Sequence, residues 1–316
     1  MTPMPTRSFT LLEKESRLAF WLLAPTCTVV LALVVFPVIW NVWLSFKAVS
    51  LGDLRGDTLF DFNLTLENFR KIFMDPDFFP VLFTTLIYTI AGSALSVFLG
   101  LFAALLVHGE FPGRSLLRGL FIAPYIAPIV AVTFVWSFIL DPQLGILNWM
   151  AMDIGLWTQP IPFLSNRWWT FHFLGIPLKI PLALISVILF EGWRYFPFAF
   201  LFILARLQAI PEELYWAAAA DGASPFQRFA HVTLPQLTTV LSTLFLFRFI
   251  WTLNKFDDIF LLTRGQAGTK VMTIKVYDYA FGEFNIGASS AAAMALFVLL
   301  SIFIFIYLRW VLGNGK

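Results

Sequence analysis

The stretch Ile210–Gln236 reads IPEELYWAAAADGASPFQRFAHVTLPQ and carries the most informative local pattern of the chain. Pro211 and the two acidic residues after it are typical of the first turn of a helix, where a missing N–H costs nothing and negative charge complements the helix dipole. Four consecutive alanines favour continuation of that helix. Gly222 then suits the left-handed residue that ends it. The stretch therefore predicts a short helix followed by a turn.

A second helix is predicted directly after this turn. Ser224 can cap it, Pro225 fits its first position, and Gln227 completes a capping box with Ser224. Pro235 predicts a break before the apolar stretch that follows. The product is a helix-turn-helix. From this local pattern alone, a surface hairpin without a role is as good an interpretation as a docking element.

The chain on both sides of this hairpin is strongly apolar. Its 316 residues are 59% hydrophobic and 13% charged, and the mean hydropathy is +0.81. Soluble domains carry about 25% charged residues, so this composition excludes a soluble globular enzyme and a disordered chain. The 37 Phe and 12 Trp suit lipid-facing and interfacial positions. A net charge of +2 gives no reason to expect a nucleic-acid partner.

Six stretches are long and apolar enough to cross a membrane as helices, since a span needs about 20 residues and backbone groups in lipid must bond internally. The fold class is therefore an all-α integral membrane protein. Pro25 and Pro37 predict a kink or a shortening of the first helix. The spans are expected at Leu18–Phe46, Pro80–Val107, Leu116–Leu140, Pro181–Leu207, Gln236–Asn254 and Ile286–Val311.

Equal numbers of Lys and Arg fall on the two sides of these spans, so their count does not orient the chain. The loops on one side are longer, and the lower density of positive residues there favours that side as the outside. Both termini and the hairpin then face the cytoplasm, and loops 47–79 and 141–180 face outward. The second loop is rich in tryptophan, which fits interfacial anchors as well as a contact surface for an external partner.

The sequence offers no pattern for catalysis or metal binding. Cys27 is the single cysteine, which excludes an intrachain disulfide and a cysteine zinc site. His108, His172 and His231 are scattered without metal-ligand spacing. No phosphate-binding G-x-x-x-x-G-K-[ST] motif occurs. We therefore expect no catalytic residue, no metal and no cofactor on this chain.

The hairpin resembles the cytoplasmic EAA loop of binding-protein-dependent ABC importer permeases. That pattern runs Glu-Ala-Ala, three residues, Gly, nine residues, an aliphatic residue, any residue, Leu-Pro. Ala217-Ala218, Gly222, Val232 and Leu234-Pro235 occupy the matching places here. Trp216 stands where the family has its Glu, which removes any polar contact of that Glu but leaves the helix intact.

The resemblance extends over most of the chain. The segments WLLAPTCTVVLALVVFPVIWNVWLSF and LTLENFRKIF, together with the six spans, look like the sugar-type permeases of the maltose and glycerol-phosphate importers. Within that group the chain is similar to the first-type subunit, which is paired with a homologous second permease. We accordingly divide it into an N-terminal cytoplasmic segment 1–17, a first span with its external loop 18–79, and a permease core 80–313 that includes the loop 210–236.

The resemblance implies a chain without chemistry of its own in a bacterial inner membrane. An ATPase dimer would bind ATP and Mg²⁺, and an extracytoplasmic solute-binding protein would deliver a sugar or sugar derivative for import by alternating access. The loop helix would dock in a groove of an ATPase subunit, where small alanines permit close approach. The docking residues would be Glu213, Tyr215, Trp216, Ala217, Ala218, Asp221, Gly222 and Ala223.

The substrate path should lie among polar groups within the spans, because such groups are costly in lipid and face a cavity or a partner. Aromatic rings beside hydrogen-bonding groups suit a sugar. By resemblance, the residues that match the lining of the sugar site are Tyr125, Glu191, Arg194, Tyr195, Thr252, Asn254 and Lys255.

Other interpretations of these residues stay open. Glu191 and Arg194 lie three apart on one helix face and can pair with each other. Arg248 can face the second permease, and Lys255, with the two aspartates after it, can lie at the outer interface. A sharper hypothesis is that Arg194 or Lys255 faces a phosphate, sulfonate or carboxylate on the substrate.

Two other functions compete with the importer permease. A secondary transporter of a small polar solute would show an inverted repeat with interrupted helices and a coupling carboxylate, and it leaves the hairpin pattern unexplained. Glu191 is the one acid well inside a predicted span. An integral-membrane enzyme would need clustered catalytic side chains near one interface, which the sequence does not show.

Overall fold

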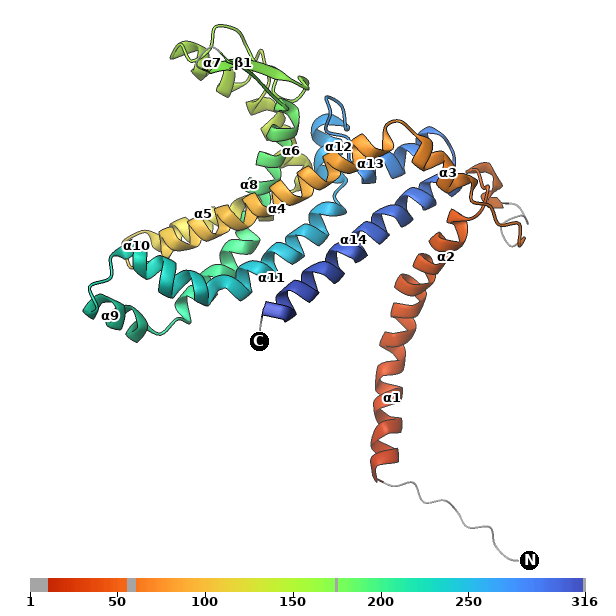
Figure 1. The fold of residues 1–316 in the computed structure, drawn as a ribbon, viewed down its shortest axis with the longest axis horizontal. Coiled ribbons are helices and arrows are strands. Elements are labelled where there is room, and N and C mark those ends of the chain that lie inside the picture. Colours follow the sequence, from red (N-terminus) through yellow and green to blue (C-terminus); the bar gives the residue numbers. More distant parts are fainter. Residues whose placement is uncertain (1–10, 56–60, 174–175, 315–316) are drawn as a thin grey trace, which may run out of the picture.

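The computed structural model describes residues 11–55, 61–173 and 176–314, and this part of the chain is almost entirely helical (Figure 1). Residues 1–10 of the predicted N-terminal segment 1–17 lie outside the described residues. The first half holds α1 (Leu11–Val30), η1 (Leu31–Val35), α2 (Phe36–Ser45), η2 (Gly52–Arg55), α3 (Glu67–Met74), α4 (Phe78–His108), α5 (Arg114–Ile126), α6 (Ile129–Ile139) and α7 (Ile146–Asp153). The second half holds β1 (Trp169–Phe173), β2 (Ile176–Ile180), α8 (Leu182–Gln208), α9 (Glu212–Ala220), α10 (Pro225–Arg228), η4 (Phe229–Thr233), α11 (Leu234–Leu253), α12 (Asp257–Thr263), α13 (Met272–Tyr277), η5 (Asp278–Gly282) and α14 (Ile286–Asn314).

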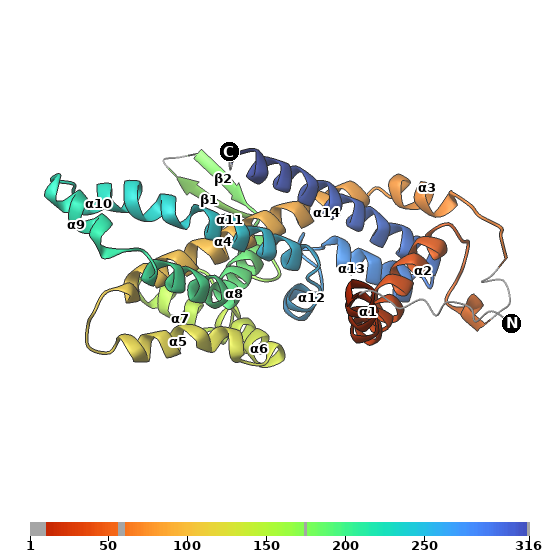
Figure 2. The same cartoon turned by 90° about the horizontal axis from the view of Figure 1, so that it is seen from below.

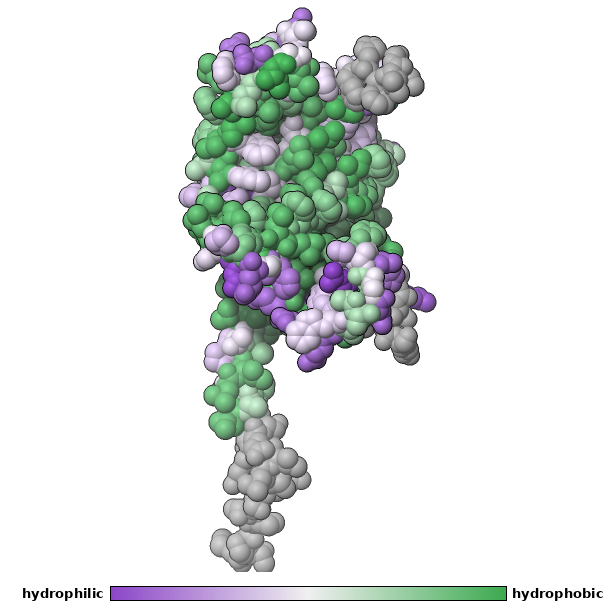
Figure 3. Space-filling model, turned by 90° about the vertical axis from the view of Figure 1, so that its left-hand side faces the viewer, coloured by the Kyte–Doolittle hydropathy of each residue, from purple (hydrophilic) through white to green (hydrophobic). Residues whose placement is uncertain are grey.

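Five helices of the described chain are long and apolar enough to cross a membrane, and they agree with five of the six predicted spans. Their bounds are Leu18–Ser45, Phe78–His108, Leu182–Gln208, Pro225–Leu253 and Ile286–Trp310. Figure 3 shows the apolar middle that such spans create, with hydrophilic residues gathered above and below it. The fold is thus the all-α membrane protein that the sequence predicts.

The third predicted span, Leu116–Leu140, is not one straight helix. It divides into α5 and α6, whose axes are bent by 99°. The break lies at Ala127, which adopts an extended conformation with ψ of 143° before Pro128. Proline disfavours the helical conformation in the residue before it and lacks the N–H that would continue the helix. The pair makes a sixth span only if both halves form one crossing.

The expected break at Pro235 is wrong, because α10, η4 and α11 form one continuous helix, Pro225–Leu253. The π turn η4 ends two residues before this proline, and the π turn η1 ends two residues before Pro37 in the first span. A π turn is wider than an α turn, which gives room to a proline ring that would otherwise clash with the carbonyl four residues earlier. Both helices therefore run through their prolines.

The segment between α6 and α8 is more ordered than the loop that the sequence predicts. It contains α7 and an antiparallel hairpin in which Trp169 pairs with Ile180. In Figure 1 this segment lies at the opposite extremity of the bundle from α9. The side chains of Trp149 and Trp168 are exposed there.

The centre of the bundle is the contact between α4 and α8, the most extensive helix pair in the described chain. Glycines allow it: a Cβ at Gly100 would lie 2.6 Å from the Cβ of Ala199, and a Cβ at Gly192 would lie 2.5 Å from Leu95. Figure 2 shows α11 and α14 on one side of this pair and α5 with α6 on the other. The first span projects from the bundle and packs on α14 through α2 (Figure 1).

An ionic cluster fastens the corner between α3 and α4 to the segment before α14. The Asp75 carboxylate contacts Lys275 Nζ at 2.6 Å and accepts a hydrogen bond of 2.6 Å from the Tyr279 hydroxyl. Burial alone would raise the pKa of the Asp75 carboxyl, but the hydrogen bonds from Lys275 and Tyr279 bring the pKa below its ordinary value. Asp75 thus stays ionised and holds the two segments together.

Substitution of Gly100 tests the close contact of α4 with α8. In Gly100→Ala the new methyl group would meet Ala199 Cβ at 2.6 Å and Phe200 N at 2.8 Å, so the helices must separate. We expect a loss of about 1–3 kcal/mol of stability, measured as a lower melting temperature of the purified chain. Gly119→Ala is the matched control, because nothing lies within 4 Å of that Cβ. Equal melting temperatures for the two variants would contradict the packing described.

Candidate functional site

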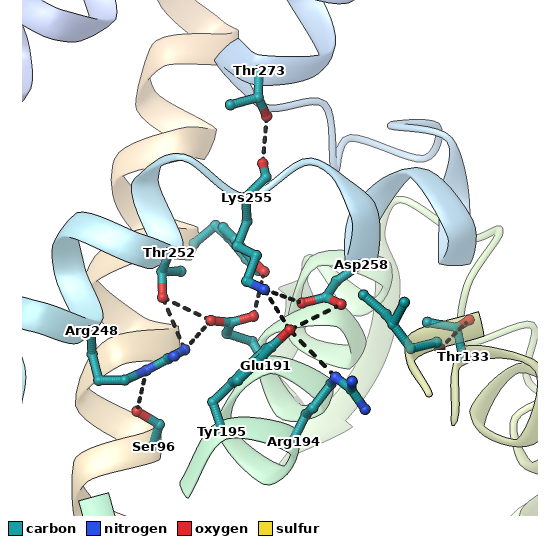
Figure 4. Close-up of polar contacts among 12 residues, drawn as sticks. Ser96, Thr133, Glu191, Arg194, Tyr195, Arg248, Thr252, Lys255, Asp258 and Thr273 are labelled. Carbon is teal, nitrogen blue, oxygen red and sulfur yellow. Dashed lines mark hydrogen bonds and ion pairs between the residues drawn. The ribbon is translucent and has the colours of Figure 1, made fainter. Parts of the chain in front are cut away.

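Six of the seven residues predicted to line the substrate path meet in one cluster, contributed by α5, α8, α11 and the segment before α12. Figure 4 labels Glu191, Arg194, Tyr195, Thr252 and Lys255 of this cluster. Tyr125 at the end of α5 packs edge-on against Tyr195, with ring centroids 6.1 Å apart. Asn254 is the exception. Its amide donates to Ile250 O at 2.8 Å on its own helix, and the side chain is exposed.

Glu191 lies at the centre of the cluster, with 0% of the residue exposed. Its carboxylate forms an ion pair with Arg248 of α11 and accepts hydrogen bonds from Tyr88 at 2.9 Å and Thr252 at 2.7 Å. Gly92 of α4 makes room for it, since a Cβ there would lie 2.8 Å from Glu191 Cγ. A buried carboxylate needs such pairing, because an isolated charge in an apolar interior is very costly.

Arg248 joins the same ion pair to α4. Its Nε donates to Ser96 Oγ at 3.1 Å and its Nη2 to Thr252 Oγ1 at 3.1 Å. The guanidinium is buried, so the interpretation that Arg248 faces a second permease is wrong. Three spans, α4, α8 and α11, are therefore tied together at one polar point.

Arg194 does not pair with Glu191, although their spacing on α8 allows it. Its two terminal nitrogens donate instead to Pro124 O and Ala127 O, each at 3.0 Å, at the break between α5 and α6. The Glu191 carboxylate pairs instead with Arg248, which belongs to another helix, α11. Sequence spacing reveals contacts within one helix but not a partner that packing supplies from elsewhere.

A second group of charges surrounds Tyr195. Its hydroxyl accepts from Lys255 Nζ and donates to Asp258 Oδ1 at 3.4 Å, and Lys255 Nζ lies 3.6 Å from Asp258 Oδ2. The cations of Arg248 and Lys255 lie 4.4 Å and 4.1 Å from the ring centroid. Asp258 is fully buried within the chain, just after the end of α11, and the place of Lys255 and the two aspartates at the outer interface stays a prediction. Sequence reasoning missed Tyr88, Ser96 and Asp258 as members of the cluster, and only the aspartate carried a signal, as a charge at a span end.

The residues predicted to line the substrate path differ in how far their side chains are exposed. Tyr125 is 43% exposed, Asn254 is exposed and the Lys255 side chain is 19% exposed. Glu191 and Thr252 are sealed within the chain. Partly exposed aromatics of α8 and α11 also pack on one another, with Phe198 and Trp251 ring centroids 4.9 Å apart and Trp251 stacked on Phe247 at 5.9 Å. The accessible surface of the cluster thus combines aromatic faces with hydrogen-bonding groups.

The hairpin between α8 and α11 has the predicted form. Gly222 ends α9 with a φ of 78°, and Ser224 and Gln227 form the capping box at α10. The Tyr215 hydroxyl lies 3.0 Å from Thr233 Oγ1, which ties α9 to η4. Trp216 is 65% exposed.

A hollow of about 280 Å³ lies beside α9. It is lined by Ala218, Asp221, Gly222, Ala223, Gln227, Arg228, His231 and Val232. Four of the predicted docking residues therefore border one concave surface, while Glu213 and Trp216 are exposed on the helix itself.

Comparison with known proteins places the chain among membrane transport components. Residues 96–312 match the family described as binding-protein-dependent transport system inner membrane component. The chain is 34% identical over 301 residues to the inner membrane ABC transporter permease protein YcjO of Escherichia coli, covering 94% of this chain and 95% of that one. It is 30% identical over 302 residues to the trehalose/maltose transport system permease protein MalF of Thermococcus litoralis, covering 94% of each.

The fold also matches a solved structure. A chain in the crystal structure of a bacterial alginate ABC transporter, in complex with an alginate pentasaccharide-bound periplasmic protein, superposes with a TM-score of 0.75. The match covers 93% of each chain at 20% sequence identity. At this identity the likeness concerns the fold.

Removal of one partner tests the buried ion pair. Arg248→Met leaves the Glu191 carboxylate buried without its cation, so we expect a loss of about 3–5 kcal/mol of stability. The double variant Glu191→Gln/Arg248→Met should recover more than half of that loss, because no charge is then left unpaired. Thermal melts of the purified variants measure both effects.

Lys71→Met is the control, because it removes a cation from the ion pair of Lys71 with Glu283, whose side chains are each 43% exposed. Exposed pairs contribute about 0–1 kcal/mol, so this variant should melt close to the wild type. A double variant as unstable as Arg248→Met would show that the unpaired Glu191 carboxylate is not the source of the loss.

Proposed function

We propose a specific role for this chain, which belongs to the family of binding-protein-dependent transport system inner membrane components: it is the membrane-spanning permease subunit of an ATP-driven importer of a sugar or sugar derivative. The observation that carries this proposal is the α9 hairpin, a polar helix-turn-helix held between two spans of a permease-family chain. The relative from Thermococcus litoralis is named for trehalose and maltose transport, and the solved neighbour for alginate. These names favour a carbohydrate as the substrate.

ATP hydrolysis in this proposal belongs to a partner ATPase dimer, which binds ATP and Mg²⁺, and α9 is the element that docks on it. Exposed Trp216 offers an aromatic anchor, and small alanines let a groove approach the helix closely. The Tyr215–Thr233 contact and the unbroken helix Pro225–Leu253 then connect α9 to Arg248 and Thr252 without a flexible joint. Movement of the ATPase would thus reach the buried cluster directly.

The orientation of the chain in the membrane follows from the assignment of α9 as the ATPase-docking helix. If α9 faces the cytoplasm, six crossings place both termini there, with the α7 segment on the outside. The other partners would be a homologous second permease and an extracytoplasmic solute-binding protein. We keep the division into residues 1–17, 18–79 and a permease core 80–313, because the first span projects from the bundle and packs on α14 through its α2 end.

The substrate would meet the accessible side of the cluster. Within the cluster we assign direct contact to Tyr125, which is exposed, and to Lys255, which is partly exposed; Asn254 is exposed but lies outside the cluster. Trp251 and the aromatic side chains that pack on it supply faces on which a sugar ring can stack. Glu191, Tyr195 and Thr252 would hold these groups in place from the buried side.

Reconstitution tests the function. The chain, purified with the proteins that accompany it from its native membrane and placed in vesicles with the binding protein, should accumulate a sugar only when ATP is present on the α9 side. Neutral disaccharides and acidic oligosaccharides are the two substrate sets to compare. Uptake driven by an ion gradient, by a chain that purifies alone, would contradict the proposal and favour a secondary transporter.

Trp216→Ala tests the docking helix. Loss of an exposed aromatic anchor should weaken ATPase binding by about 2 kcal/mol, measured as a roughly 30-fold rise in the Kd for the ATPase and seen as lower ATPase recovery with the chain. Trp149→Ala is the matched control, because this tryptophan is 64% exposed at the opposite extremity. Equal ATPase recovery with both variants would remove α9 from the docking surface.

A further inference from the structure

The bend between α5 and α6 creates a problem of hydrogen bonding inside an apolar stretch. In a continuous helix Pro124 O would accept from the N–H of residue 128, but Pro128 has no N–H. Ala127 is extended, so its carbonyl also leaves the helical pattern. An unsatisfied backbone group in a membrane costs several kcal/mol, so both carbonyls need other donors.

Arg194 supplies both donors. Its Nη1 donates to Pro124 O and its Nη2 to Ala127 O, each at 3.0 Å, and the residue is only 6% exposed. The planar guanidinium presents its donors in a fixed fork that reaches two acceptors at once, which a lysine ammonium does not. Among the described residues, no ion pair joins Arg194 to a carboxylate. Its charge is therefore held by backbone dipoles and by the Tyr195 hydroxyl, which lies 3.4 Å from Nε.

Residues of α8 next to Arg194 pack against both arms of the bend, α5 and α6. Trp193 stacks on Trp136 of α6, with ring centroids 5.2 Å apart. Phe121 of α5 packs edge-on against Phe196 at 6.0 Å and Phe200 at 5.6 Å. Arg194 lies between these contacts, at the corner itself. One stretch of α8 thus touches both arms and the break.

We propose that Arg194 is a positioning residue that fastens α8 to the break between α5 and α6 and maintains the bend, so that the bent pair moves with α8. Because three residues separate the end of α8 from the start of α9, a displacement of α9 would pass along α8 to this corner. The role in movement rests on the proposed function; the role in the bend does not. Three of the five N–H groups of Arg194 are engaged within the chain and the residue is 6% exposed, which favours this positioning role over contact with an anionic substrate.

The experiment measures the bend directly. Spin labels at Leu116 and Phe138, which are 69% and 59% exposed, are introduced in a Cys27→Ala background of the full chain within its purified assembly. Along one straight helix at about 1.5 Å per residue these positions would lie about 33 Å apart, and at the observed 99° bend about 21 Å apart. We expect the short distance in the parent and a longer, broader distribution in both Arg194→Leu and Arg194→Lys.

Arg206→Leu is the control for loss of an arginine from α8, because Arg206 bonds to Gln236 near the other end of the helix. It should keep the parent distance. Arg194→Lys retains the positive charge but loses the fork of donors. A changed distance between the spin labels in this variant would therefore show that the bend depends on the fork and not on the charge alone. If Arg194→Leu is too unstable to purify, Arg194→Lys still gives the measurement.

Two results would overturn the proposal. The first is the parent distance in both Arg194 variants. The second is loss of uptake for acidic sugars alone with an unchanged bend, which would make Arg194 a substrate-binding residue. Absence of ATP-driven sugar uptake by the parent assembly would instead refute the proposed function and leave the result on the bend standing.

Discussion

An unsatisfied polar group in the buried, apolar middle of this bundle is costly, so polar side chains there are stabilised by partners within the protein. This constraint explains why Glu191, Arg248, Tyr88 and Thr252 converge from three helices on one point. It also explains why Arg194 turns away from the nearest carboxylate toward two carbonyls that a proline-rich break has released. The close contact of α4 with α8, made possible by glycines, brings these groups within reach of one another.

The sequence predicts those features that depend on neighbours along the chain. Apolar length predicted four spans closely and the end of a fifth, which begins at Pro225 and not at Gln236, and caps, alanines and Gly222 predicted the helix-turn-helix. Prolines were harder to interpret, because their effect depends on the turn that precedes them. A π turn carries the helix through Pro235, while Pro128 has no such turn before it and the helix bends by 99°.

The partners of the site residues could not be predicted, because they come from helices distant in sequence. Spacing favoured a pair between Glu191 and Arg194, whereas packing supplies Arg248 from α11. Tyr88 carried no signal, since a tyrosine in an apolar helix is unremarkable until a carboxylate lies beside it. The exposure of the side chains could not be predicted from the sequence either, because Glu191 and Thr252 are buried whereas Tyr125 is exposed.

The account rests on a rigid path from the α9 hairpin to the buried cluster. The direct measurement is an experimental structure of the purified assembly trapped with a non-hydrolysable ATP analogue. The account predicts that α9 sits in a groove of an ATPase subunit, that the helix Pro225–Leu253 stays unbroken, and that Glu191 still contacts Arg248. A structure in which α9 touches no other protein, or in which that helix breaks at Pro235, would contradict it.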